Sequence, residues 1–260
     1  MKKILSMILA LTMVFALCAC GSAKSDSDLE YIKKKGTLVV GITDFAPMDY
    51  KDEAGEWIGF DADMAKAFAS SLGVKAEFIE IDWDNKVLEL NNKSIDCVWN
   101  GMTLTDEVTT TMSCGDAYCN NAQVVVLAAA VADQYQDVAS LKDLAFAVEN
   151  GSAGMDAAAE NGFNFTAVDT QAKALMEVAS GTSDACIIDL LMAGAMIGEG
   201  TSYPELTYTV KLTSEEYGVG FRLGGDMAAA YNEFYAKAYK DGTVLDIARV
   251  YGVQESVLAK

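Results

Sequence analysis

From Gly36 onward, the chain alternates short apolar runs with segments whose apolar residues recur every three or four positions. The first series consists of expected strands at 37–42, 76–81 and 96–99 and expected helices at 60–72 and 85–90. The helix at 60–72 is followed by Gly73, a common residue at a helix C-terminus. Strands that alternate with helices are typical of parallel sheets covered by helices, so this pattern predicts an α/β fold.

The same alternation restarts after a long apolar strand expected at 123–130. The second series is a helix start at 140–144, a strand at 145–148, a helix at 155–161, a strand at 165–168, a helix at 171–180 and a strand at 185–188. A strand at 217–223 and helices at 226–240 and 243–251 complete the chain. We therefore expect two α/β lobes joined by two hinge strands.

The positions of the two hinge strands set the expected lobe boundaries. Residues 36–122 together with 218–260 are predicted to form lobe 1, and residues 123–217 are predicted to form lobe 2. In α/β folds, ligands bind where loops converge at the carboxyl ends of strands. A ligand cleft between the lobes is therefore expected.

The N-terminus has the pattern of an export signal. A short cationic start, Met1-Lys2-Lys3, precedes an apolar run at 4–17 that is shorter than the roughly 20 residues of a membrane-spanning helix. The run and the small residues before Cys20 resemble a bacterial lipoprotein signal. We expect residues 1–19 to be a signal peptide, Cys20 to be lipidated and residues 20–35 to form a tether; an ordinary secretory signal is the alternative.

Composition excludes several classes of function. The 260 residues include no histidine. They include 19 basic and 38 acidic side chains, which gives a formal net charge of −19. Without histidine there is no Ser-His-Asp or Cys-His nucleophilic system and no HExxH zinc site. Nucleic-acid binding is not expected, because phosphate contacts require stripes of lysine and arginine. We also expect no metal and no cofactor.

Four cysteines follow the signal segment. Cys97 and Cys186 lie in apolar strand-like runs, which favours small buried hydrophobic side chains. Cys114 and Cys119 flank a turn-like segment, and export would permit a disulfide between them. A Cys114–Cys119 disulfide and two free thiols both remain open at this point.

Five short segments occur in a recognisable order. They are TDFAPM at 43–48, GFDADMA at 59–65, NGMTLT at 100–105, GDAY at 115–118 and EEYGVGFR at 215–222. Together they resemble the ABC-transporter solute-binding proteins for polar amino acids, over about residues 37–251. The resemblance implies a two-lobed periplasmic-binding-protein-like fold of type II, with two hinge strands and the ligand cleft between the lobes.

The resemblance also implies how particular residues grip an amino acid. The Gly101 carbonyl, the Thr103 hydroxyl and the Asp189 carboxylate would accept hydrogen bonds from its ammonium group. Backbone N–H groups of Ser152 and Ala153, at a helix start, would point at its carboxylate. The other predicted ligand-contacting residues are Phe45, Met48, Trp83, Asn100 and Met102.

Three of these roles have structural alternatives. Asp189 follows an apolar strand, where an aspartate is often a helix N-cap. The segment before Ala153 could be a plain glycine turn, and Trp83 could belong to a partly exposed core.

The main departure from the family pattern is Val108. The family has an arginine here that binds the ligand's α-carboxylate, and the chain's two arginines, Arg222 and Arg249, fall in stretches not expected at the cleft. A valine cannot replace a bidentate charged contact. Lys86 could supply the charge, backbone N–H groups could bind the carboxylate alone, or the ligand could be a cationic amine. A solvated surface lysine is the alternative for Lys86.

The predicted function is therefore that of a receptor and not of an enzyme. The expected protein is a monomer, lipid-anchored on the extracytoplasmic face of the cell membrane, that captures a small amino acid or related amine and delivers it to an ABC permease. The first alternative is a dehydratase-like enzyme on the same fold, with Asp44, Asp49 and Glu149 as candidate acids or bases. The second is a receptor for a cationic amine that is not an amino acid.

Overall fold

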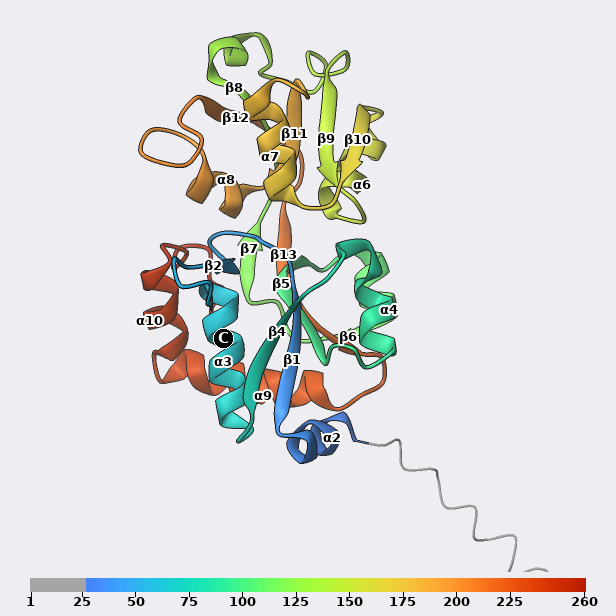
Figure 1. Cartoon of the computed structure of the whole chain (residues 1–260), viewed down its shortest axis with the longest axis vertical. Helices are drawn as coiled ribbons and strands as arrows, with labels where there is room; N and C mark the ends of the chain where they lie inside the picture. Colours follow the sequence, from blue (N-terminus) through green and yellow to red (C-terminus); the bar gives the residue numbers. More distant parts are fainter. Residues whose placement is uncertain (1–26) are drawn as a thin grey trace, which may run out of the picture.

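Two separate β-sheets organise residues 27–260, the part of the chain described by this computed structural model. Each sheet is the centre of one lobe, and the lobes are stacked along the long axis of the molecule (Figure 1). The predicted signal peptide, the lipidation site Cys20 and the first part of the predicted tether lie outside the described residues. The two-lobed α/β architecture predicted from the alternating pattern is confirmed.

Lobe 1 contains a six-stranded sheet in the order β4-β1-β5-β13-β6, with β7 also paired to β13. Strand β1 is parallel to β4 and β5, whereas β13 returns antiparallel to β5. The elements of lobe 1 are α2 (Asp28–Lys35), β1 (Thr37–Ile42), β2 (Tyr50–Lys51), β3 (Trp57–Ile58), α3 (Phe60–Ser71), β4 (Lys75–Glu80), the 3-10 helix η1 (Trp83–Asn85), α4 (Lys86–Asn91), β5 (Cys97–Thr103), α5 (Asp106–Thr111), β6 (Met112–Cys114), β7 (Cys119–Asn121), β13 (Glu215–Arg222), α9 (Met227–Lys240) and α10 (Thr243–Val250).

Lobe 2 contains a five-stranded sheet in the order β10-β9-β11-β8-β12. Strands β9, β10 and β11 are parallel, and β8 is antiparallel to both β11 and β12. The elements of lobe 2 are β8 (Gln123–Ala128), the 3-10 helix η2 (Ala129–Gln134), β9 (Ala145–Glu149), α6 (Ala153–Asn161), β10 (Asn164–Val168), α7 (Gln171–Ser180), β11 (Ala185–Asp189), α8 (Leu190–Met196) and β12 (Leu206–Lys211).

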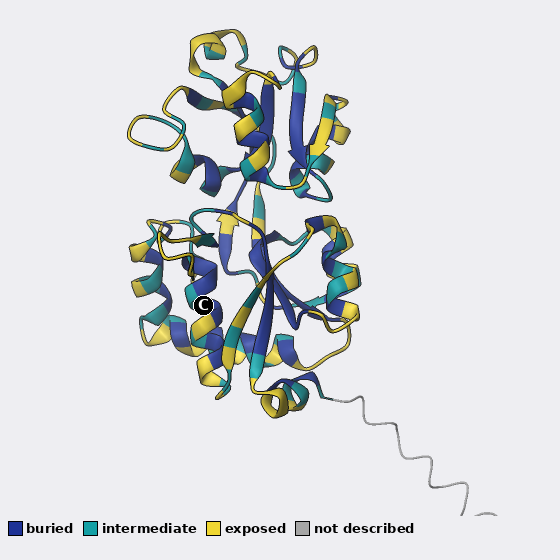
Figure 2. Ribbon diagram, in the orientation of Figure 1, coloured by how far each residue is buried: buried dark blue, intermediate teal, exposed yellow. Residues whose placement is uncertain are grey.

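Buried residues concentrate on the central strands and on the inner faces of the helices (Figure 2). In α3, the predicted helical spacing places Phe60, Met64 and Phe68 on one fully buried face. The Phe68 ring packs near Trp99 of β5, which in turn lies 5.2 Å from the Tyr231 ring of α9. This aromatic core holds β5 in place, and β5 carries four of the predicted site residues, Asn100 to Thr103, toward its C-terminal end.

The two lobes are joined at Ala122, between β7 and β8, and again at 212–214, between β12 and β13. The connections run side by side, since Leu212 N donates to Gln123 O (2.8 Å) and Gln123 N donates to Thr213 Oγ1 (2.8 Å). Strand β13 begins at Glu215, which pairs with β7 of lobe 1. The return to lobe 1 therefore occurs three residues earlier than the predicted boundary.

Two predicted elements differ from the structure. The predicted helix start at 140–144 is a turn, because Ser140 donates from its backbone N to Asp137 Oδ1 (2.9 Å) and from its hydroxyl to Asp137 O (2.7 Å). Only residues 141–144 lie between Ser140 and the start of β9, and these are too few to form a stable helix. The predicted tether at 20–35 is wrong for its last part, which forms α2 with Ser27 as its side-chain N-cap and Gly36 after its last residue.

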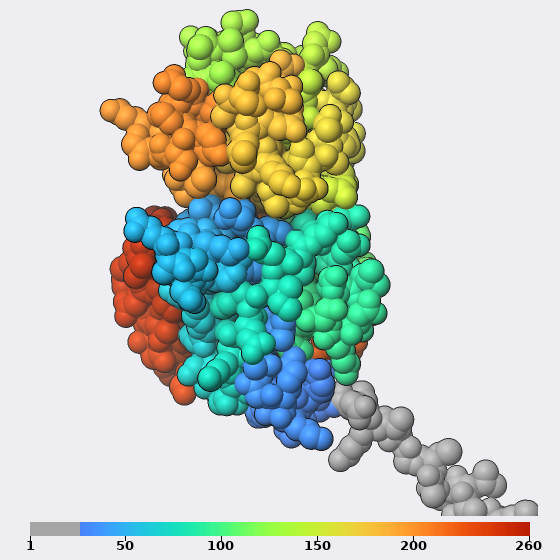
Figure 3. Space-filling view, in the orientation of Figure 1, coloured from blue at the N-terminus to red at the C-terminus, as the bar shows by residue number. Residues whose placement is uncertain are grey.

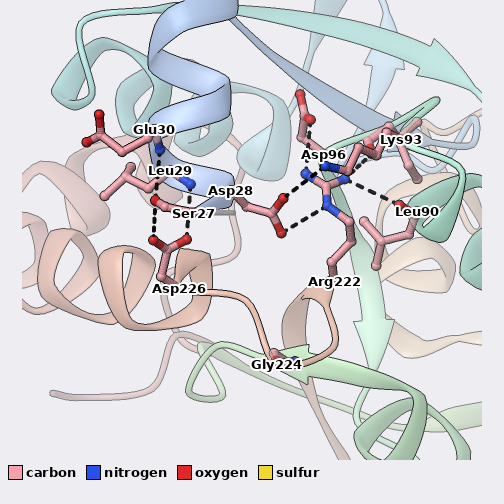
Figure 4. Close-up of polar contacts among 12 residues, drawn as sticks. Ser27, Asp28, Leu29, Glu30, Leu90, Lys93, Asp96, Arg222, Gly224 and Asp226 are labelled. Carbon is pink, nitrogen blue, oxygen red and sulfur yellow. Dashed lines mark hydrogen bonds and ion pairs between the residues drawn. The ribbon is translucent and has the colours of Figure 1, made fainter. Parts of the chain in front are cut away.

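Helix α2 is fixed to lobe 1 by buried charges (Figure 4). We call Asp28, Lys35, Asp96 and Arg222 the base cluster. Arg222 Nε lies 2.9 Å from Asp28 Oδ2, and Arg222 Nη2 lies 3.3 Å from Asp96 Oδ1. Lys35 Nζ lies 2.6 Å from the other Asp96 oxygen. The prediction that Arg222 does not face the cleft is thereby explained, because this arginine holds the N-terminal helix instead.

The four cysteines at 97, 114, 119 and 186 are free thiols. Cys114 pairs with Gly220 on β13, and Cys119 pairs with Tyr217 on the same strand. Partners three residues apart along one strand separate the two cysteine Cα atoms by about 10 Å. A disulfide needs Cα atoms within about 7 Å, so the predicted alternative of a Cys114–Cys119 bond is wrong for this fold.

No helix between residues 27 and 260 combines the length and the apolar character that crossing a membrane requires.

Candidate ligand-binding site

A cavity lies between the two lobes, which abut each other in the space-filling view (Figure 3). Both lobes contribute to its lining, at the carboxyl ends of their central parallel strands. The predicted site residues that line it are Phe45, Trp83, Lys86, Asn100, Gly101, Met102, Thr103, Ser152, Ala153 and Asp189. Val108 also lines the cavity and is buried, so a valine stands at the wall where the family pattern has an arginine.

Met48 does not line the cavity, in contrast to the prediction. Its side chain is fully buried in the core of lobe 1, and its carbonyl accepts from Asp61 N (3.0 Å) and Ala62 N (3.3 Å). Gly59 lies so close that a Cβ there would be 2.1 Å from the Met48 carbonyl oxygen. Met48 therefore satisfies free N–H groups at the start of α3, a structural role.

On the lobe 1 wall, Asn100 and Gly101 shape the backbone. The Asn100 amide accepts from Thr43 N (2.9 Å) and donates to Asp49 Oδ2 (2.7 Å), which ties β5 to the end of β1. Gly101 has φ +55°, and a Cβ there would be 2.4 Å from the Phe45 ring. Only glycine lets the Phe45 ring pack this closely against β5.

Two of the three candidate acids for an enzyme do not line this cavity. Asp49 is fully buried in lobe 1, and burial together with the nearby Asp61 carboxyl raises its pKa well above the usual range. Asp44 lines a separate groove together with Tyr50 and Trp57, and burial raises its pKa as well. Glu149 is the candidate that lines the cavity.

On the lobe 2 wall, Ser152 caps helix α6, where its hydroxyl accepts from Met155 N (3.2 Å). The Ser152 N–H donates to the Glu149 carbonyl (3.3 Å), so it is engaged within the lobe. Of the two predicted amide donors for a ligand carboxylate, Ala153, at the first position of α6, is therefore the better placed.

Asp189 ends β11 and stands at the N-cap position of α8, but its side chain makes no capping bond. Its Oδ1 instead accepts from Asn121 Nδ2, from Gln123 Nε2 (2.9 Å) and from Tyr217 OH (2.7 Å). Its Oδ2 accepts from Gln171 Nε2. Burial and the nearby Glu215 carboxylate raise the pKa of Asp189 to about 7.

Glu149 ends β9, the strand next to β11, and is 3% exposed. Its Oε1 has no hydrogen-bond partner among residues 27–260. Burial and the Asp189 carboxylate raise the pKa of Glu149 to about 8, against the lowering effects of Lys86 and of hydrogen bonds from Gln171. The site thus contains a buried carboxyl oxygen that no other group in the described part of the chain satisfies.

Lys86 is buried, so the solvated-lysine alternative is wrong. Its Nζ donates to the carbonyls of Gly151 (3.0 Å) and Trp83 (3.3 Å) and lies 5.1 Å from the Trp83 ring centroid. Burial lowers the pKa of Lys86, and Glu107 and Glu149 oppose that effect. Because Trp83 belongs to lobe 1 and Gly151 to lobe 2, this ammonium group links the two lobes.

Gly151 also lets the lobes approach. A Cβ at Gly151 would be 2.8 Å from Asp84 Oδ1 and 2.9 Å from Asp84 Cα, and Gly151 has φ +68°. The absence of a side chain therefore allows the lobe 2 loop to touch the lobe 1 backbone beside the cavity.

Sequence reasoning missed the polar residues that surround Asp189, namely Asn121, Gln123, Gln171, Glu215 and Tyr217. They come from the hinge strands and the start of α7. A positional signal was available for Gln171 alone, because it follows the carboxyl end of the parallel strand β10, where polar residues face the ligand cleft. Within residues 27–260, no group of three or more His, Cys, Asp or Glu side chains is arranged to hold a metal ion.

Comparisons with known proteins agree with this geometry. Residues 38–254 match the model of the bacterial extracellular solute-binding proteins, family 3. The arginine-binding extracellular protein ArtP of Bacillus subtilis is 33% identical over 201 residues, which are 74% of this chain and 75% of ArtP.

Solved structures show the same fold. A mutant of ArgBP from T. maritima superimposes with a TM-score of 0.80 at 28% identity, covering 86% of this chain and 99% of that protein. The ancestral amino acid-binding protein AncCDT-1, a precursor of cyclohexadienyl dehydratase, gives a TM-score of 0.79 at 32% identity, with 86% and 99% coverage.

Proposed function

Because this chain belongs to the bacterial extracellular solute-binding proteins of family 3, we propose that it captures a small amino acid between its lobes and delivers it to an ABC permease. The observation that carries this proposal is the cavity lined by both lobes at the carboxyl ends of their strands. A ligand bound there touches both lobes at once, so its binding energy favours the closed arrangement. The similarity to ArtP, an arginine-binding protein, and to AncCDT-1, an amino acid-binding protein, supports an amino acid as the ligand.

Lys86 takes the place of the missing arginine as the group that attracts the ligand carboxylate. It lies buried in the cavity wall, and among residues 27–260 it is the one cationic side chain that lines the cavity. The Ala153 N–H at the start of α6 adds a donor from lobe 2. Val108 contributes only apolar surface.

An enzyme on the same fold is the less supported alternative. The likeness to a precursor of a dehydratase keeps it in view, but of the three candidate acids only Glu149 lines the cavity. General acid–base chemistry needs a group within hydrogen-bond reach of the substrate, and Asp49 is directed into the lobe 1 core.

We further propose that the protein is a monomer and that it is anchored at the extracytoplasmic face of the membrane through a lipidated Cys20; the N-terminal pattern supports the anchor. Helix α2 lies at the end of lobe 1 that is remote from lobe 2 (Figure 1). An anchor attached before α2 would therefore leave the cleft between the lobes unobstructed. Metabolic labelling with a fatty acid, compared between wild type and Cys20→Ser, tests this part; equal labelling would contradict it.

Isothermal titration calorimetry against the standard amino acids tests the ligand class. We expect Lys86→Met to weaken binding of an amino acid about 10- to 100-fold, because a charge-assisted contact of about 1.5–3 kcal/mol is lost. Lys240→Met, at an exposed lysine outside the cavity lining, is the matched control and should bind like wild type. Chemical conversion of the bound compound would contradict the receptor function.

A further inference from the structure

An acid at the start of the second hinge strand lies next to the cavity without being part of its lining. Glu215 is the first residue of β13, is half-buried and does not belong to the cavity wall. It directly follows the connection at 212–214 through which the chain returns to lobe 1. Its hydrogen bonds nevertheless reach a residue that does line the cavity, Thr103.

The Glu215 carboxylate gathers donors from several segments. Its Oε1 accepts from the Thr103 hydroxyl (2.9 Å), from Asn121 Nδ2 (2.7 Å) and from Gln123 Nε2 (2.8 Å). Its Oε2 accepts from the Thr213 hydroxyl (3.0 Å). Asn121 ends β7 and Gln123 begins β8, so this one carboxylate is bonded to residues at both connections between the lobes.

The bond from Thr103 fixes what its hydroxyl can offer to a ligand. Thr103 ends β5 at the cavity. A hydroxyl has one proton to donate and two lone pairs that accept. Because the proton of Thr103 is directed at Glu215, only lone pairs of the Thr103 oxygen are left for the cavity. This oxygen therefore receives a hydrogen-bond donor of the ligand, such as an ammonium group, and offers no proton to a carboxylate.

The two amides extend this arrangement to Asp189. An amide NH₂ group has two hydrogens, enough for one bond to each of two acceptors. Asn121 Nδ2 and Gln123 Nε2 each donate to Asp189 Oδ1 as well. They therefore bridge the carboxylates of Glu215 and Asp189. Asp189 Oδ2 receives one hydrogen bond within residues 27–260, from Gln171 Nε2, and so keeps the capacity to accept from a ligand.

We propose that Glu215 is a positioning residue for the ammonium group of the ligand. It acts through Thr103, whose hydroxyl it restricts to accepting, and through the two amides that hold Asp189 Oδ1. Thr103 belongs to lobe 1 and Asp189 to lobe 2, so one carboxylate at the hinge orients acceptors on both sides of the cavity. The proposal rests on the proposed function, because it requires a ligand with an ammonium group between the lobes.

A double-mutant cycle between Glu215→Met and Thr103→Val tests the proposal by isothermal titration calorimetry. The probes are the standard amino acids, and the one that binds wild type most tightly is titrated into every variant. These compounds share a charged α-amino group, so the cycle does not depend on which side chain the cavity accepts. Thr103→Val removes the hydroxyl while the shape of the side chain is kept.

We expect Glu215→Met to weaken binding about 10-fold, because the Thr103 hydroxyl is released and Asp189 loses its bridge. Glu215→Gln keeps an oxygen that accepts from Thr103 and should bind within about threefold of wild type. Glu216→Met is the matched control, at the exposed next residue outside the cavity lining, and should bind like wild type.

The cycle separates positioning from a structural role of Glu215. If Glu215 acts through Thr103, the loss caused by Glu215→Met should be at least about threefold smaller in the Thr103→Val background than in wild type. Equal losses in the two backgrounds overturn the proposal. Glu215→Met binding within twofold of wild type overturns it as well.

The pH profile of Glu215→Gln is a second readout, which holds even if Glu215→Met fails to fold. Burial and the Glu215 carboxylate raise the pKa of Asp189 to about 7, so wild-type affinity should fall as pH decreases through about 7. Without the charge of Glu215, this fall should move to lower pH. Glu149, with a pKa of about 8, titrates in both proteins. Identical profiles overturn the proposal.

Failure of the proposed function gives a different pattern. If wild type binds agmatine, an amine without a carboxylate, but no amino acid, the amino-acid ligand class is wrong, and the same cycle run with agmatine decides the role of Glu215. If wild type binds amino acids and the two losses are equal, the receptor function stands and the role of Glu215 is wrong. Binding of neither class by wild type overturns both.

Discussion

Buried charge is handled in two different ways in two regions of this molecule. In the base cluster, Asp28 and Asp96 face Arg222, and Asp96 also faces Lys35. At the cavity, the buried acids of lobe 2, Glu149 and Asp189, face amides, a tyrosine hydroxyl and another carboxylate. The first region is electrically complete without a ligand, and the second is not.

This difference shows where a chain with few cations places them. A buried acid that is paired with arginine has its charge balanced whether or not a ligand is present. This pairing holds Asp28, and with it helix α2, at the base of lobe 1. Buried acids that lack a cation raise their pKa values, as Asp189 and Glu149 do, to about 7 and about 8. Such groups favour the arrival of a positively charged partner.

The largest effect is expected from breaking the base cluster. Arg222→Met should lower the free energy of unfolding by about 3–5 kcal/mol, because it leaves Asp28 and Asp96 buried without their arginine. Urea denaturation measures the change. Ligand affinity of the folded variant should stay within twofold of wild type, and a loss of affinity would show that the two regions are coupled.

A smaller effect is expected from the cavity acid that is already satisfied. Asp189→Asn should lower the free energy of unfolding by about 1–3 kcal/mol, since the amide nitrogen cannot accept from Gln171. The same denaturation experiment tests it. A cost as large as that of Arg222→Met would remove the distinction between a paired and an unpaired buried acid.

The pH dependence of stability isolates Glu149. Its folded pKa of about 8 lies above the ordinary value, so the folded state holds a proton that the unfolded chain has released. Stability from this group is therefore lost as pH rises toward 8, by at most about 1.4 kcal/mol per pH unit. The pKa values of Asp61 and Asp189 are also raised, to about 7. These two groups therefore contribute a pH dependence of the same sign in wild type and in a variant that lacks the Glu149 carboxyl.

Glu149→Gln should therefore unfold with a shallower pH dependence than wild type between pH 6 and 9. Thermal unfolding midpoints of the two proteins, measured in parallel across that range without ligand, provide the comparison. Parallel curves would mean that Glu149 is ionised in the folded state throughout.

The smallest effect is expected at the other arginine. Arg249 is exposed and pairs with Asp246 one helical turn away, 2.7 Å from its Oδ1. Arg249→Met should change the free energy of unfolding by less than about 0.5 kcal/mol, because exposed ion pairs contribute little. This variant is also the control for Arg222→Met, and a cost above 1 kcal/mol would show that removal of either arginine destabilises the chain nonspecifically.

Much of the architecture was predictable because it depends on local periodicity. The spacing of Phe60, Met64 and Phe68 is enough to place a buried helix face, and the apolar run at 123–130 is enough to place a strand. The turn around Ser140 was mispredicted because a side-chain hydrogen bond to Asp137 competes with helix formation there. Helix α2 was missed although Ser27 and Gly36 mark its ends locally, and its attachment to lobe 1 through Arg222, almost two hundred residues away, could not be predicted.

By itself, the sequence determined the α/β alternation, the two lobes, the family, and most of the residues that line the cavity, since these follow from patterns within short segments. Only the tertiary structure decided that Met48 supports α3, that Cys114 and Cys119 stay apart, and that Lys86 is buried between the lobes. It also decided that four hydrogen bonds reach the Asp189 carboxylate, whereas Glu149 Oε1 has no partner among residues 27–260. The physical reason is that hydrogen-bond satisfaction and burial depend on groups from distant segments, which only folding brings within 3 Å of one another.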